Sequence, residues 1–169
     1  MERSVTMKGN PLALSGTELK VGDKAPDFTV TDNNLAQTGP AAFRDKVKVI
    51  LAVPSLDTPV CDIETRRFNQ EAGKLGEEVA VLTISMDLPF AQKRWCGAAG
   101  ASHVTTLSDY KDASFGNAYG VLVKDLRLLA RAVFVVDKSD TIKHIEIVRE
   151  ITSEPDYGAC IAAVNSCLE

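Results

Sequence analysis

Two apolar runs that flank a helical segment most constrain the fold of this chain. Residues 47–53 (VKVILAV) and 79–85 (VAVLTIS) are almost continuously apolar and rich in β-branched side chains, which is typical of strands covered on both faces. Residues 59–75 between them are polar and helix-prone, and Gly76 follows as a helix terminator. A strand, a helix and a second strand in this order predict a right-handed crossover between parallel strands.

Shorter elements are expected around this unit. In chain order they are a hairpin over 5–14, a helix over 88–99, a strand over 104–107, a short helix over 112–118, a hairpin over 131–137 and 142–148, and a helix ending at 168. Ser153 is the expected N-cap of the last helix, with Pro155 in its first turn. The pattern predicts an α/β protein with a mixed central sheet. No linker, repeat or low-complexity stretch interrupts it, so residues 1–169 are expected to form a single domain.

Composition and charge argue against several classes of partner. Charged residues make up 25% of the sequence, hydrophobic residues 45%, and the net charge is −4. A negative chain without a Lys/Arg cluster favours neither nucleic acid nor an anionic membrane as a partner. No apolar run approaches the roughly 20 residues that span a bilayer. The first residues lack the apolar region of a signal peptide, so the cytoplasm is the expected location.

The chain has four cysteines: Cys61, Cys96, Cys160 and Cys167. In a cytoplasmic protein they are expected as thiols, and a disulfide among them is expected to be catalytic rather than structural. There is no Cys-x-x-Cys pair, and the two histidines, His103 and His144, are isolated, which argues against a zinc site. No Gly-rich phosphate loop is present either, so no metal or cofactor is expected.

Cys61 lies between the first apolar run and the helix that follows it. Thr58 suits the N-cap and Pro59 the first helical position, so Cys61 falls at the third. The first amides of a helix have no partner within it and the helix dipole is positive there, so a thiolate is favoured over a thiol. Most free cysteines are small buried apolar residues, and Cys61 shares a helix face with Phe68. The strand-to-helix junction favours the reactive thiolate.

Charged residues near Cys61 bear on this interpretation. The acidic neighbours, Asp57, Asp62 and Glu64, oppose a thiolate, so a compensating cation is required. Two arginines, Arg66 and Arg67, lie farther along the helix and are interpreted as solvated. Arg131 begins an otherwise apolar strand, where a charge needs a buried purpose or an open edge.

The residues around Cys61 resemble the active-site signature of peroxiredoxins. Pro54, Thr58 and Cys61 form the pattern Pro-x-x-x-Thr-x-x-Cys, and SLDTPVC at residues 55–61 is similar to the version in bacterial thiol peroxidases. The likeness continues at residues 107–109, 119–121 and 129–137. It implies a thioredoxin-like fold with an N-terminal β-hairpin extension.

The resemblance also implies an activity, a thiol-dependent peroxidase that reduces hydrogen peroxide and organic hydroperoxides to water and alcohols. Cys61 is then the nucleophile, Cys96 resolves its sulfenic acid as an intramolecular disulfide, and Arg131 contacts the thiolate and the peroxide. Thr58 is expected to place its hydroxyl beside the sulfur, and Pro54 to shape a dry wall. Thioredoxin is the implied reductant, and a homodimer the implied assembly.

From the residues alone, three cysteines could condense with a sulfenic acid at Cys61. Cys160 and Cys167 are seven residues apart on one helix face and are interpreted as core residues. The helix of Cys96 is followed by Gly97 and Gly100, which are poor helix formers and are expected to ease local melting.

Three other classes stay open from the sequence. A thioredoxin-type disulfide reductase would need a Cys-x-x-Cys partner, which Cys61 lacks. A cysteine hydrolase would use His103 or His144 as its base. A non-peroxidase thiol protein of thioredoxin fold would leave Cys61 inert, and it is distinguished by failing to consume one equivalent of peroxide per chain.

Overall fold

The computed structural model describes residues 2–169, which form a seven-stranded mixed sheet in the order β11-β10-β5-β6-β7-β3-β4. The strands are β3 (Val30–Thr31), β4 (Gln37–Thr38), β5 (Val47–Ala52), β6 (Val79–Ser85), β7 (Val104–Ser108), β10 (Ala132–Val136) and β11 (Ile142–Ile147). The strands β5, β6 and β7 are parallel, whereas β10 is antiparallel to β5 and β11 is antiparallel to β10. The predicted crossover and the mixed α/β sheet are confirmed.

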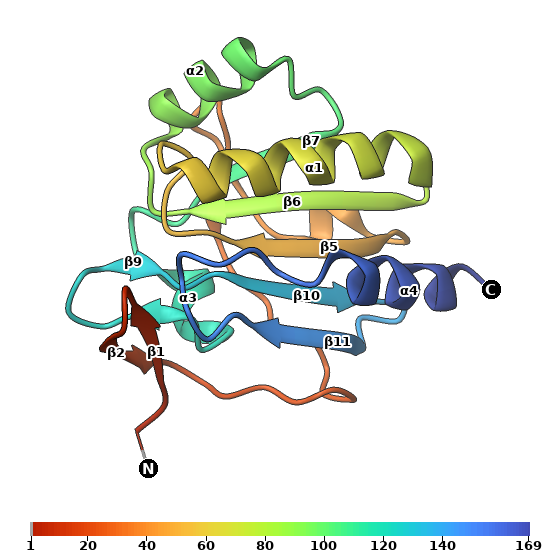
Figure 1. Cartoon of the computed structure of the whole chain (residues 1–169). Coiled ribbons are helices and arrows are strands. Elements are labelled where there is room, and N and C mark those ends of the chain that lie inside the picture. Colours follow the sequence, from red (N-terminus) through yellow and green to blue (C-terminus); the bar gives the residue numbers. More distant parts are fainter. Residues whose placement is uncertain (1) are drawn as a thin grey trace.

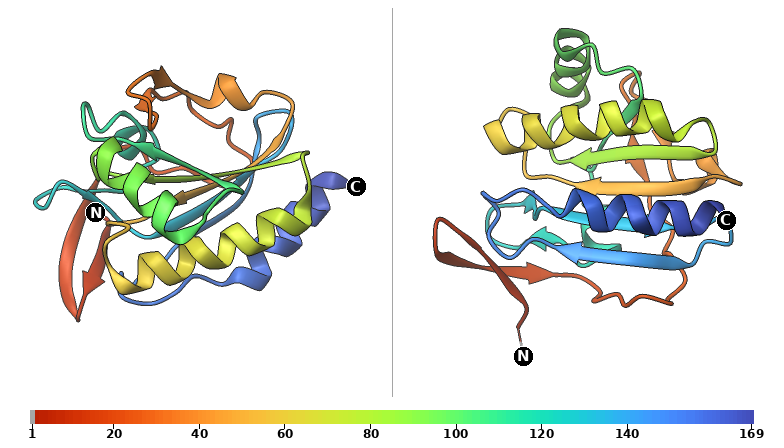
Figure 2. Two further views of the ribbon diagram at one scale, coloured as in Figure 1. Left: turned by 90° about the horizontal axis from the view of Figure 1, so that it is seen from above. Right: turned by 45° about the vertical axis from the view of Figure 1, so that its right-hand side comes forward.

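Helices cover both faces of this sheet. They are α1 (Pro59–Leu75), α2 (Pro89–Ala99), α3 (Ser114–Ala118) and α4 (Tyr157–Leu168), with a 3-10 helix, η1 (Pro40–Phe43). Figures 1 and 2 show α1 and α4 side by side over one face, while α3 lies behind the sheet in Figure 1. Among residues 2–169, no helix has both the length and the apolarity to cross a bilayer.

The core consists of two apolar clusters, one on each face of the sheet. Successive side chains of β5 point to opposite faces of the sheet, as in any strand, and so belong alternately to the two clusters. Leu51 packs with Phe68 of α1 and Val164 of α4, whereas Ile50 packs with Phe115 of α3. The continuous apolar run in the sequence is explained by this double burial.

An N-terminal hairpin extends the fold, as expected. It consists of β1 (Ser4–Met7) and β2 (Asn10–Ser15), which join β8 (Leu122–Val123) and β9 (Leu128–Leu129) in a second sheet. The hairpin is bound to the segment after β11, because Ile151 N donates to Thr6 O at 2.8 Å. Glu150 adds to this contact by accepting hydrogen bonds from Thr6 Oγ1 and Gly9 N, both at 2.9 Å.

The start of α4 differs from the expectation. The helix begins at Tyr157, and its N-cap is Asp156, whose Oδ1 accepts a hydrogen bond from Ala159 N at 3.0 Å. The predicted cap at Ser153 is wrong, because Ser153 N closes a turn onto Glu150 O at 2.9 Å. A carboxylate closer to the apolar stretch supplies the cap instead.

Two glycines with the same backbone angle test how tightly the N-terminal extension packs. Gly16 and Gly22 both have φ of +100°, but a Cβ at Gly16 would collide with the backbone of Asn117, and one at Gly22 would meet nothing within 4 Å. Alanine at either site carries a left-handed cost of roughly 1–2 kcal/mol. We expect G16A to lower the free energy of unfolding by roughly 1–3 kcal/mol more than G22A, because overpacking adds to that cost. Urea denaturation measures both, and equal losses would contradict the close approach.

Candidate active site

Cys61 is the third residue of α1, as predicted, and its side chain has no exposed surface. The chain leaves β5 at Ala52, passes the buried Pro54 and enters the helix at Pro59. Pro59 occupies the first helical position, where a missing N–H costs nothing. The sulfur therefore lies in the first turn of a helix, beside a sheet end, in the interior of the protein.

The register of the sheet brings Arg131 to the same place. Ala132, the first residue of β10, pairs with Ala52, the last residue of β5. Arg131 therefore lies where the chain turns from β5 toward α1. Val133 packs in the apolar cluster that contains Cys61, and Arg131 is two residues earlier, so it faces the same side of the sheet.

The guanidinium of Arg131 contacts the sulfur directly. Its Nη2 donates to Cys61 Sγ at 3.3 Å, and its Nε donates to Ile151 O at 2.7 Å. Only 1% of the residue is exposed. An arginine stays charged in proteins, so this buried cation favours a negative charge on the sulfur that it contacts.

Glu64, one helical turn after Cys61, is a second buried side chain beside Arg131 that can carry a charge. It is fully buried, and its Oε2 lies 3.7 Å from Arg131 Nη1. Burial raises the pKa of the Glu64 carboxyl to about 8, although the Arg131 guanidinium opposes that shift. The raised pKa favours the neutral carboxyl, which competes with the sulfur for Arg131 less than a carboxylate would. The interpretation of Glu64 as a negative neighbour that opposes the thiolate is therefore revised.

The other two acidic neighbours have cations of their own. Asp57 lies 3.8 Å from Arg94, and both side chains are well exposed. Asp62 accepts hydrogen bonds from Arg66 Nε with both oxygens at 3.0 Å. Each of these two carboxylates is therefore paired with an arginine other than Arg131. Arg66 is about half exposed, consistent with its interpretation as a solvated residue.

Thr58 is at the N-cap, but its side chain does not cap the helix. Its Oγ1 donates to Ser55 O at 2.9 Å, and Asp62 N is bonded to the backbone carbonyl of Thr58 at 3.0 Å. The predicted side-chain cap is wrong because the hydroxyl turns back toward its own loop. Within residues 2–169, no hydrogen bond joins Thr58 to Cys61.

Cys96 lies on α2, partly exposed, and its sulfur is 3.3 Å from Thr106 Oγ1. The preceding residue, Trp95, is buried in the cluster that contains Cys61. All four cysteines are free thiols, so Cys61 and Cys96 have separate partners in this state. Gly97 lies inside α2, and Gly100 ends it with a left-handed φ of +63°.

The two cysteines of α4 are poor nucleophiles. Cys160 is fully buried, and burial raises the pKa of its thiol to about 12. Burial also raises the pKa of the Cys167 thiol. Cys160 is the core residue that the sequence predicted, whereas Cys167 lies at the edge of the cluster and is partly exposed. Both remain protonated at neutral pH.

Neither histidine lies in the site. His103 packs against Gly73 in the last part of α1, and His144 belongs to β11. In the described part of the chain no hydrogen bond joins either of them to Cys61, so the base of a cysteine hydrolase is missing. No group of three or more metal-ligating side chains converges among residues 2–169.

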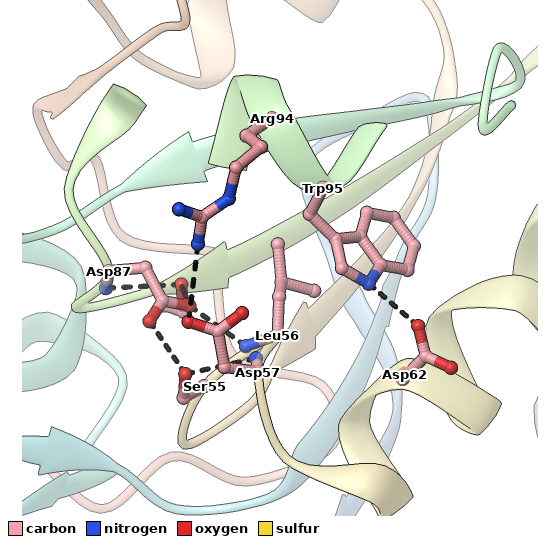
Figure 3. Close-up of polar contacts among 8 residues, drawn as sticks. Ser55, Leu56, Asp57, Asp62, Asp87, Arg94 and Trp95 are labelled. Carbon is pink, nitrogen blue, oxygen red and sulfur yellow. Dashed lines mark hydrogen bonds and ion pairs between the residues drawn. The ribbon is translucent and has the colours of Figure 1, made fainter. Parts of the chain in front are cut away.

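One residue near the site was missed by the sequence analysis. Asp87, between β6 and α2, accepts a hydrogen bond from Ser55 Oγ at 2.7 Å and one from Leu56 N at 2.8 Å (Figure 3). Both partners belong to the segment 54–58 that leads into α1. An aspartate between a strand and a helix normally suggests only a cap, so the sequence contains no signal for this contact.

Comparison with known proteins places the chain in a family. Residues 20–161 match the family model Redoxin. The thiol peroxidase of Oceanobacillus iheyensis is 56% identical over 96% of this chain and 98% of its own length. For the thiol peroxidase of Bacillus subtilis the identity is 53%, over 98% of each chain.

A solved structure shares the fold of this protein over nearly the whole chain. The peroxiredoxin-like protein from Aquifex aeolicus superposes with a TM-score of 0.91 and 44% identity, covering 99% of this chain and 98% of that one. Its fold therefore extends over the N-terminal hairpin as well as the central sheet. With these matches spanning nearly every residue of each protein, the chain belongs to the Redoxin family and, within it, to the bacterial thiol peroxidases.

Proposed function

The chain is a thiol-dependent peroxidase, and we propose that Cys61 is its peroxide-reducing residue, with Arg131 holding it as a thiolate. One observation carries the proposal, the 3.3 Å contact between Arg131 Nη2 and Cys61 Sγ. Both groups lie in the interior, where electrostatic interactions are strong because water does not screen them. A thiolate is the nucleophilic form of cysteine.

In the first step, the Cys61 thiolate attacks one oxygen of the hydroperoxide, and the O–O bond breaks. The sulfur becomes a sulfenic acid, and the leaving oxygen takes up a proton as water or an alcohol. Negative charge moves from the sulfur to that leaving oxygen. Arg131 Nη1 has no hydrogen-bond partner within residues 2–169, so it is available to donate to the developing charge.

Two loop residues complete the proposed pocket. The Thr58 hydroxyl donates to a backbone carbonyl, which leaves its oxygen as an acceptor for the proton of the peroxide. Pro54 is buried and carries no N–H, so it adds an apolar wall without an unpaired donor. Cys61 has no exposed surface, so a peroxide reaches the sulfur only after small movements of the side chains that cover it.

In the second step, the Cys96 sulfur attacks the sulfenic acid, which forms a Cys61–Cys96 disulfide and releases water. The two sulfurs have separate partners, Arg131 for Cys61 and Thr106 for Cys96, so we infer that α2 rearranges to bring their Cα atoms within the roughly 7 Å that a disulfide requires. Gly97 within α2 and Gly100 at its end lower the cost of unwinding. The helix runs at the surface, where a dithiol protein can reach the disulfide.

We extend the proposal to thioredoxin as the reductant, to a homodimer, and to the cytoplasm as the location. The partial exposure of Cys96 supports attack by a protein thiol. We also propose that the chain forms one thioredoxin-like domain, because the similarity to the family extends over nearly its whole length.

Replacement of the nucleophile tests this proposal. We expect Cys61→Ser to abolish peroxide-dependent NADPH oxidation with thioredoxin and its reductase, because a serine hydroxyl stays protonated. Cys167→Ser is the matched control and should keep the wild-type rate. Peptide mapping after one equivalent of peroxide should find Cys61 joined to Cys96. Near-wild-type turnover in Cys61→Ser would refute the assignment.

Arg131→Met tests the cation. It keeps an unbranched apolar stem and removes the guanidinium with its charge, so we expect less of the nucleophilic thiolate at Cys61. Peroxide reduction should slow by roughly 100-fold or more, as when one donor to a developing oxyanion is lost. Thiolate ultraviolet absorbance against pH and rapid-mixing kinetics measure the two effects. Arg67→Met, on the exposed side of α1, is the control. If Arg131→Met and the wild type gave the same curve of thiolate absorbance against pH, the electrostatic role of Arg131 would be contradicted.

Glu64→Gln tests the buried carboxyl through the pH dependence of stability. Folding raises the pKa of Glu64 from 4.5 to about 8, so between these values the unfolded chain is ionised while the folded chain keeps the proton. The free energy of unfolding therefore falls as pH rises through this window, by up to about 1.4 kcal/mol per pH unit. A glutamine at this position does not ionise, so the free energy of unfolding of E64Q lacks this pH-dependent fall. We expect denaturant titrations to show E64Q gaining roughly 1–3 kcal/mol on the wild type between pH 5.5 and pH 7.5; parallel pH profiles would exclude a protonated Glu64.

A further inference from the structure

Asp87 binds the loop that leads into the Cys61 helix. Its Oδ1 accepts a hydrogen bond from Ser55 Oγ at 2.7 Å, and its Oδ2 accepts one from Leu56 N at 2.8 Å. Ser55 Oγ also accepts a hydrogen bond from Asp57 N at 3.1 Å, which extends the contact along the loop. Hydrogen bonds to a carboxylate are shorter and stronger than neutral ones, so one side chain fixes most of residues 54–58.

The same carboxylate is joined to the start of α2. Asp87 Oδ2 also accepts a hydrogen bond from Ser85 Oγ at 2.7 Å. That hydroxyl in turn accepts one from Gln92 Nε2 at 3.0 Å, in the first turns of α2. Gln92 is fully buried and donates to Leu107 O at 2.8 Å as well. One continuous polar network therefore connects loop 54–58 with the helix that carries Cys96.

A second contact joins the two helices one turn farther along. Trp95 Nε1 donates to Asp62 Oδ1 at 2.7 Å, and the Arg66 guanidinium lies 5.7 Å from the centre of the indole ring. Trp95 immediately precedes Cys96. Figure 3 shows Trp95 reaching Asp62 of α1 while Asp87 reaches the loop on the other side of Leu56. The folded α2 thus contacts the chain both before and after Cys61.

These contacts link the loop before Cys61 to the helix that carries Cys96. In the proposed second step α2 unwinds, which would separate Gln92 from Ser85 and remove part of the support for Asp87. We propose that Asp87 is a positioning residue that holds loop 54–58 in the peroxide-reducing arrangement only while the start of α2 is folded. The inference rests on the proposed roles of Cys61 and Cys96. What it adds is the role of Asp87, which joins Ser55 and Leu56 of the loop to Ser85 and, through Ser85, to Gln92 of α2.

Two substitutions of Asp87, measured on each step separately, test this. Asp87→Ala removes every acceptor, whereas Asp87→Asn keeps one oxygen for Leu56 N. In a Cys96→Ser background, we expect Asp87→Ala to lower the rate constant of Cys61 oxidation by hydrogen peroxide about tenfold or more, and Asp87→Asn to lower it less. With Cys96 present, the disulfide-forming phase, followed by Trp95 fluorescence, should stay the same or become faster.

Asp57→Asn is the matched control, because Asp57 also joins this loop to α2, through an exposed contact with Arg94 at 3.8 Å. It should leave both rate constants unchanged. Equal slowing of both steps in Asp87→Ala and Asp87→Asn, or no change in either, would overturn the positioning role of Asp87. A wild-type chain that turns over without a Cys61–Cys96 disulfide would instead overturn the proposed role of Cys96 and the coupling with it, so the two failures are distinguishable.

Discussion

The antiparallel pairing of β10 with β5 is the constraint on which the proposed active site depends. It places Ala132 beside Ala52, and so delivers the guanidinium of Arg131 to the first turn of α1. A buried cation without an anion would cost several kcal/mol. Cys61 and Glu64 are the two nearby groups that could carry the compensating negative charge. The raised pKa of the Glu64 carboxyl favours its neutral form, so the sulfur is the better anion for Arg131. Fold and reactivity are therefore linked through one side chain.

The parts of this structure that the sequence predicts are those decided by local patterns. Continuous β-branched runs predicted β5 and β6, and cap chemistry placed Cys61 at the third position of α1. A charge at the edge of an apolar strand marked Arg131 as unusual. The family resemblance, rather than spacing, singled out Cys96 among three candidate cysteines, because helix position alone does not say which thiol a sulfenic acid reaches.

The residues that escaped prediction depend on tertiary burial or on competition between neighbours. Glu64 lies in a polar helical stretch and is indistinguishable there from a solvated glutamate, until α1 packs on the sheet and encloses it. The partners of Asp87 are some thirty positions earlier in the chain. Asp156 rather than Ser153 caps α4, and the Thr58 hydroxyl bonds its own loop, because short polar side chains choose among nearby backbone groups.

The N-terminal hairpin has a consequence for how this protein is handled. Ile151 is held on both sides, since its amide donates to Thr6 O and its carbonyl accepts from Arg131 Nε at 2.7 Å. A single residue, Ile151, thus connects the first strand of the chain with the guanidinium that contacts Cys61. A tag or a truncation that disturbs β1 would therefore act on the residue whose carbonyl orients the guanidinium of Arg131.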